Sequence, residues 1–69
     1  MNLHAFADDQ ELHVDKTEHG WEWAVFHRRR DRTIKAGVAR SLELAKTAAA
    51  QAAEVEPETL TWKLIGDSS

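Results

Sequence analysis

The segment 21–28 constrains the fold more than any other part of this sequence, because large apolar side chains alternate with polar and smaller ones along it. A period of two is typical of a β-strand with one buried face. Trp21, Trp23 and Val25 fall on one side of that strand. We expect this side to be covered by another element, because burial is the usual role of tryptophans in such a row.

Two further segments extend the predicted sheet. In residues 11–15 polar and apolar side chains alternate. In residues 33–39 apolar side chains occupy every second position, at 34, 36 and 38. Each segment therefore predicts a strand. The Arg29-Arg30 pair lacks the Gly or Asn that a primed two-residue turn prefers. We therefore expect a four-residue loop over 29–32 between the tryptophan strand and the strand that follows it.

The pairing register of these last two strands follows from putting their apolar residues on one face. In the later strand the apolar residues are Ile34, Ala36 and Val38. A four-residue loop then sets Trp23 opposite Val38. It also sets Val25 opposite Ala36.

The alanine-rich stretch in the second half of the chain predicts a helix over 42–54. Ser41 is a favourable N-cap, because its hydroxyl can accept a hydrogen bond from a free amide of the first turn. Pro57 cannot continue the helix and marks its end. The apolar stripe at helical spacing consists of Leu42, Ala45, Ala49, Ala52 and Val55. Because alanine is small, we expect the helix to approach the sheet closely and the tryptophans to fill the remaining space.

The end of the chain predicts one more strand. Leu60, Trp62 and Leu64 alternate with their neighbours over 60–65, and Gly66 ends the run. Because a helix precedes this strand, we expect it to run parallel to its neighbour in the sheet. Its place, beside the first or the third predicted strand, stays open.

Together these elements predict an α+β fold: a small antiparallel three-stranded sheet with one alanine-rich helix packed on one face and a short C-terminal strand. A single domain is expected over 11–66. Residues 1–10 show no periodicity and are expected to be loose, and 67–69 are expected to form a frayed tail.

Size and composition favour self-association. The chain has 69 residues and no cysteine. A domain of this size buries only about 60% of its unfolded surface, and disulfides cannot add stability here. We therefore expect a homodimer. The amino terminus has no signal-peptide pattern, and no stretch approaches the roughly 18 apolar residues of a membrane span, so we expect a cytoplasmic location without membrane contact.

The residues needed for nucleophilic catalysis are scarce in this chain. Cysteine is absent and Ser41 is accounted for as a helix cap, so we expect no enzymatic activity, no catalytic residue and no cofactor. The histidines match neither a helical metal-binding pair nor a zinc-finger spacing, so no metal site is expected. They are His4, His13, His19 and His27.

Basic residues gather in the middle of the chain, where they could meet an anionic partner at the arginine loop. If the hairpin over 28–35 bound nucleic acid, the contacts would come from Arg28, Arg29, Arg30, Arg32 and Lys35. Acidic residues flank this set, and the sequence pI is about 5.7. Nucleic-acid binding is therefore the alternative hypothesis and not the favoured one.

Four features follow one another between Trp21 and Ala53. They are the tryptophan-led strand, the basic turn, the strand ending Lys35-Ala36-Gly37-Val38-Ala39 and the helix start Ser41-Leu42-Glu43-Leu44-Ala45. In this arrangement the segment resembles the three-stranded sheet plus helix at the amino end of tyrosine-family phage integrases. The resemblance covers about half the chain and lacks the bulky aromatic that the family usually places before the helix. It implies a sheet whose outer face grips DNA.

The favoured hypothesis is a protein-interaction module. On the sheet face away from the helix we expect a modest apolar patch formed by Ala24, Phe26 and Ala39. A second copy could cover this patch, or it could extend a sheet edge near Leu12 or Leu60. The sequence thus predicts a non-enzymatic interaction or regulatory module that self-associates, and it does not define a cellular role.

Overall fold

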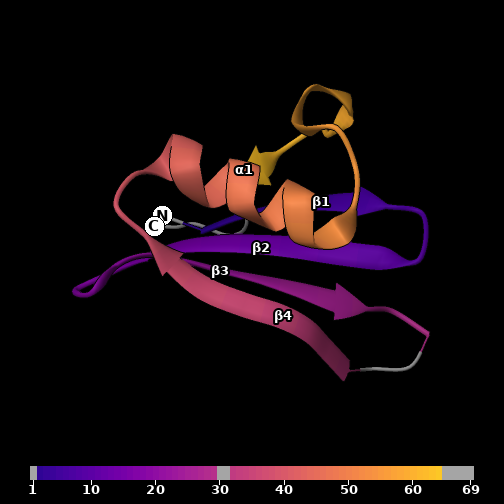
Figure 1. The fold of residues 1–69 in the computed structure, drawn as a ribbon, viewed down its shortest axis with the longest axis horizontal. Coiled ribbons are helices and arrows are strands. Elements are labelled where there is room, and N and C mark those ends of the chain that lie inside the picture. The colour runs from indigo at the N-terminus through magenta and orange to yellow at the C-terminus, as the bar shows by residue number, and fades with distance from the viewer. Residues whose placement is uncertain (1, 30–31, 65–69) are drawn as a thin grey trace.

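The computed structural model describes residues 2–29 and 32–64 of the chain. Its elements are the strands β1 (Asn2–Ala7), β2 (Gln10–Thr17), β3 (Gly20–His27) and β4 (Arg32–Ala39), the helix α1 (Leu42–Ala53), the short 3-10 helix η1 (Pro57–Thr59) and the strand β5 (Lys63–Leu64). Within the described residues the strands form one antiparallel five-stranded sheet in the order β4-β3-β2-β1-β5. Helix α1 lies across one face of this sheet (Figure 1). The α+β class is confirmed, although the described sheet has five strands where three and a short terminal strand were expected.

The amino-terminal segment is part of the sheet. β1 pairs with β2 along its whole length. The turn after β1 contains Asp8, whose φ of 55° is a left-handed conformation that aspartate tolerates. The prediction that residues 1–10 are loose is therefore wrong for 2–10. The periodicity escaped sequence analysis because His4 and Phe6, which point outward, are bulkier than the fully buried Ala5 between them.

The tryptophan strand is confirmed as β3, and it lies inside the sheet. Val25 lies opposite Leu12 of β2. Trp23 lies opposite Val14, so the expected inner face of these two strands is correct. The expectation of a free sheet edge near Leu12 is wrong, because β1 occupies the other side of β2.

The register between β3 and β4 differs from the expected one. Trp23 lies opposite Gly37, and Val25 lies opposite Lys35. The register shifts between Val25 and Phe26, which leaves Ile34 as an extra residue in a bulge. A displacement of one residue moves a whole set of side chains to the other face. Val38 therefore points away from the helix and is 56% exposed, where burial was expected.

Gly37 explains why this register is favoured. A Cβ atom at this position would lie 2.8 Å from Cζ2 of Trp23 and 2.9 Å from its Cε2. The indole ring thus occupies the space that a side chain at position 37 would need. Trp23 fills the inner face above β4, and a residue without a side chain accommodates it.

Helix α1 begins as predicted. Ser41 is the N-cap, and its hydroxyl oxygen accepts a hydrogen bond of 3.2 Å from the Leu44 amide. The helix ends at Ala53, followed by Glu54 with a φ of 61°. The Val55 amide then donates to the Ala50 carbonyl at 3.0 Å, which closes the helix end as in a Schellman motif. No helix in residues 2–29 and 32–64 is long and apolar enough to cross a membrane.

The core between α1 and the sheet is small. It is centred on Leu12 and Val25 of the sheet and on Ala49 and Ala53 of the helix. Trp23 packs against this cluster as a partly buried side chain, as do Leu60 and Trp62. In the described part of the chain the largest fully buried side chains are Leu12, Val14 and Val25. Alanines on the helix permit the close approach that was expected, but they contribute little apolar area.

The last strand is shorter than predicted and lies elsewhere. After η1 the chain reaches β5, which pairs with β1 in antiparallel orientation and not in parallel. The predicted strand over 60–65 is reduced to Lys63–Leu64 in the described residues. The parallel orientation was expected because β1 was not recognised as a strand. The predicted end at Gly66 and the predicted tail over 67–69 lie outside the described residues.

Candidate functional site

The sheet face opposite α1 is the candidate site, and we call it the outer face. Side chains on directly opposite residues of paired strands share a face, so the registers define its members. They include His4 and Phe6 on β1, Glu11, His13 and Asp15 on β2, Glu22, Ala24 and Phe26 on β3, and Ala36 and Val38 on β4. In the described parts of the chain, the helix covers the other face and no element packs on this one.

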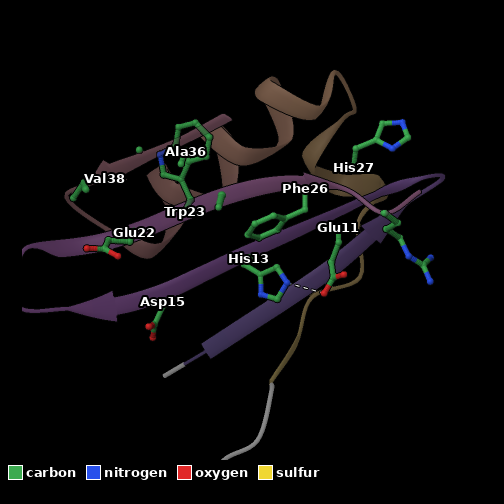
Figure 2. A pocket seen from close by; sticks show the side chains of 12 residues that line it. Glu11, His13, Asp15, Glu22, Trp23, Phe26, His27, Ala36 and Val38 are labelled. Atoms are coloured by element: carbon green, nitrogen blue, oxygen red, sulfur yellow. Dashed lines mark hydrogen bonds and ion pairs between the residues drawn. The ribbon is translucent and has the colours of Figure 1, made fainter. Parts of the chain in front are cut away.

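An open hollow of about 810 Å³ lies over strands β2, β3 and β4 on this face. Its apolar lining includes Ala24, Phe26, Ala36 and Val38. Figure 2 shows the Phe26 ring beside His13, with Glu22 and Asp15 at the other end of the hollow. The hollow is broad and apolar in its centre, with charged side chains around it.

Aromatic rings connect β1 to β3 across the outer face. The ring centroids of His4 and Phe6 are 5.1 Å apart. His4 and His13 meet edge to face at 6.2 Å, and His13 and Phe26 do so at 5.3 Å. Edge-to-face and tilted contacts at these distances are favourable, so the rings stabilise one another in place. The sequence does not reveal this row, because its rings come from three different strands.

The closest polar contact on the outer face joins His13 and Glu11. His13 Nε2 lies 2.6 Å from Glu11 Oε2. The two side chains are 33% and 30% exposed, so water reaches both of them. No group of three or more His, Cys, Asp or Glu side chains that could hold a metal ion occurs among the residues the structure describes.

The two ends of the outer face differ in charge. Asp15 and Glu22 lie opposite each other at one end. At the other end the guanidinium carbon of Arg28 lies 5.0 Å from the centroid of the Phe6 ring, in a cation-π arrangement. Glu22 and Arg28 are six positions apart along the chain, which corresponds to about 20 Å in extended conformation. The outer face therefore carries an acidic end and a basic end.

The predicted nucleic-acid contacts are not gathered on one face. Arg29 Nε lies 3.5 Å from Asp9 Oδ1, and so forms an ion pair within the chain. Lys35 lies opposite Val25 on the helix side and lines a recess there beside Trp23. Arg28 belongs to the outer face.

The remaining two members of the set add little to a common surface. Arg32 lines a separate small hollow at the end of β4. Arg30 lies outside the described residues. A continuous basic surface across the set is therefore not seen in the described residues.

The predicted interface patch is partly correct in its placement. Ala24 and Phe26 lie on the outer face and line the hollow. Ala39 lies opposite Trp21, on the helix side, so its expected place on the outer face is wrong. In the observed register, Ala36 and Val38 are the apolar residues that β4 contributes to the outer face in place of Ala39.

Comparison with known proteins adds no relative: no family model, curated protein or solved structure matches this chain. The resemblance to the integrase domain gains no support from this comparison and stays a prediction.

Proposed function

We propose that this chain is a non-enzymatic interaction module that pairs with a second copy of itself through the outer face. The observation that carries the proposal is the apolar hollow on an uncovered sheet face. Contiguous exposed apolar surface with a charged rim is typical of protein interaction sites. Phe6 is 47% exposed and Val38 is 56% exposed, which is unusual for large apolar side chains of a sheet.

The size of the core supports association with a second copy. A chain of 69 residues with a core rich in alanine has little apolar burial to offset its loss of conformational entropy. Pairing the outer faces of two copies would bury Phe6, Phe26 and Val38, so a dimer would add a second apolar layer. A self-complementary surface is what a two-fold homodimer requires.

The mix of charges on the outer face also fits a second copy. The chain has a net charge of −3, yet the hollow is lined by both acids and Arg28. A strongly basic or strongly acidic partner would be attracted by one end of the face and repelled by the other. A copy of the same face offers both signs.

The test is sedimentation velocity over a wide micromolar range, with the variant Phe26→Glu compared with the wild type. We expect the wild type to dimerise, and we expect Phe26→Glu to be monomeric with an unchanged far-UV circular dichroism spectrum. Leu44→Glu is the matched control, because Leu44 is 54% exposed on α1, away from the outer face. A monomeric wild type, or equal loss of the dimer in both variants, would contradict the proposal.

Nucleic-acid binding by the hairpin over 28–35 stays the alternative. The acids Glu11, Asp15 and Glu22 line the same hollow as Arg28, and they would repel a phosphate backbone there. A mobility-shift assay at low salt separates the two functions, because phosphate contacts are strongest under that condition.

A further inference from the structure

We infer that the two copies meet with the acidic end of one outer face against the Arg28 end of the other, around a two-fold axis that runs across the strands. This inference rests on the proposed function and specifies the geometry of the partner. The observations behind it are the order of side chains along β3 and the charges at its two ends.

The side chains of strand β3 define the order of chemical groups along the outer face. Glu22, Ala24 and Phe26 follow one another at every second residue, and Arg28 comes directly after the strand end. The order along the face is therefore acidic, small, large and basic. Asp15 reinforces the acidic end, since it lies opposite Glu22. At the basic end the carboxylate of Asp9 is paired with Arg29, and among the described residues Arg28 contacts the Phe6 ring and forms no ion pair.

Two-fold pairing of flat faces allows two principal directions for the axis. An axis along the strands, between β2 and β3, keeps each strand end over the same end of the partner, so Glu22 of one copy would face Asp15 of the other. Like charges brought together at an interface cost free energy. An axis across the strands reverses the ends, and Glu22 of each copy then faces Arg28 of the other.

The same rotation also matches side-chain volumes. With the axis level with Val25, Phe26 of one copy lies over Ala24 of the other, so a large ring meets a small side chain. His13 then lies over Glu11 of the second copy, which repeats between copies the pairing that the two residues make within one chain at 2.6 Å. Alternating large and small residues on facing layers permit interdigitated packing. The charges of Glu22 and Arg28 and the side-chain volumes along β3 therefore favour the same axis.

The experiment reverses each charge separately and then mixes the two variants. Arg28→Glu and Glu22→Arg each place like charges at both contacts of their own homodimer. We expect each to weaken dimerisation by about tenfold or more at about 0.15 M salt. In an equimolar mixture the new pairs are opposite in charge, so a heterodimer should form with nearly wild-type affinity. Native mass spectrometry distinguishes the heterodimer by its mass.

Two control variants carry the same charge changes outside the proposed contacts. Arg32→Glu alters an exposed arginine that lies opposite His27 on the helix side of the sheet, and Glu58→Arg alters an exposed residue of η1, near the helix. We expect both to change the dissociation constant by about threefold or less. Circular dichroism verifies that every variant is folded.

The outcomes separate this inference from the proposed function. A wild-type dimer that is insensitive to both reversals, or a mixture that associates no better than either variant alone, would overturn the axis while the proposed function stands. A monomeric wild type would overturn both. If Arg28→Glu does not fold, the salt dependence of the wild type decides. Association that weakens as salt rises supports charge pairing, and association independent of salt contradicts it.

Discussion

Replacement of Gly37 by alanine tests the observed pairing of β3 and β4. In most strands Gly→Ala is stabilising, because glycine loses more backbone entropy on folding. Here the added Cβ would lie 2.8 Å from Cζ2, 2.9 Å from Cε2 and 3.0 Å from Nε1 of Trp23. Contacts this short force the indole to move, and the indole packs against the core cluster of the domain.

The expected magnitude follows from two opposing effects. Overpacking of a core contact costs about 1 to 3 kcal/mol. The gain in backbone entropy is about 0.5 to 1 kcal/mol. The recess beside Trp23, lined by Ala48 and Ala52, gives the ring some room to move, so the cost should not exceed the middle of that range, about 2 kcal/mol. We expect a net loss of about 1 kcal/mol in the free energy of unfolding, or about 4 to 8 °C in Tm for a domain of this size.

The assay is thermal and urea unfolding followed by far-UV circular dichroism, for Gly37→Ala alone and combined with Trp23→Phe. The phenyl ring is smaller than the indole, so in the Trp23→Phe background Gly37→Ala should be neutral or stabilising by about 0.5 kcal/mol. Stabilisation by Gly37→Ala in the wild-type background would refute the reasoning. That result would fit the register with Trp23 opposite Val38, in which Gly37 points away from the helix.

Three further predictions concern local features of the fold. Ser41→Ala should lower the free energy of unfolding by about 1 kcal/mol, because the Leu44 amide loses its acceptor, whereas Ser41→Asp should retain most of the stability. Equal urea midpoints for the wild type and the alanine variant would contradict this prediction. Glu54→Gly should raise the stability by about 0.5 to 1 kcal/mol, because glycine adopts the positive φ of 61° without a Cβ penalty, and a lower Tm would count against the helix end described here. Leu12→Ala should cost about 3 kcal/mol, since Leu12 is fully buried at the centre of a small core; a shift in Tm of only a few degrees would show that the core lies elsewhere.

Local signals in the sequence were sufficient for the helix and for the tryptophan strand. The N-cap at Ser41 depends on a hydroxyl and an amide three residues apart, so the sequence alone defines it. The alternation along β3 placed Ala24 and Phe26 on the outer face correctly, because that pattern involves one strand only. Signals of this kind do not depend on which other segments lie nearby.

The candidate site is formed by several strands, so its members could be predicted only in part from the sequence. The row of rings from Phe6 to Phe26 passes through His4 and His13, on strands that meet only in the folded sheet. β1 itself was missed because two of its three inward residues, Ala5 and Ala7, are smaller than the outward His4 and Phe6. Without β1, half of the aromatic row and the partner of β5 were also missing.

The sequence by itself determined the elements that depend on local interactions, which are the capped alanine helix and the strand with tryptophans on one side. These two elements were enough to indicate an α+β architecture. What only the tertiary structure decided was the register of β4 and therefore which of its residues face outward. The alternation along β4 is compatible with two registers. The choice between them depends on the volume of the Trp23 indole, which extends over the neighbouring strand and leaves room there only for Gly37. That steric condition joins residues from two strands, so it exists only once the strands have paired, and it is what brings Ala36 and Val38 to the candidate interaction surface.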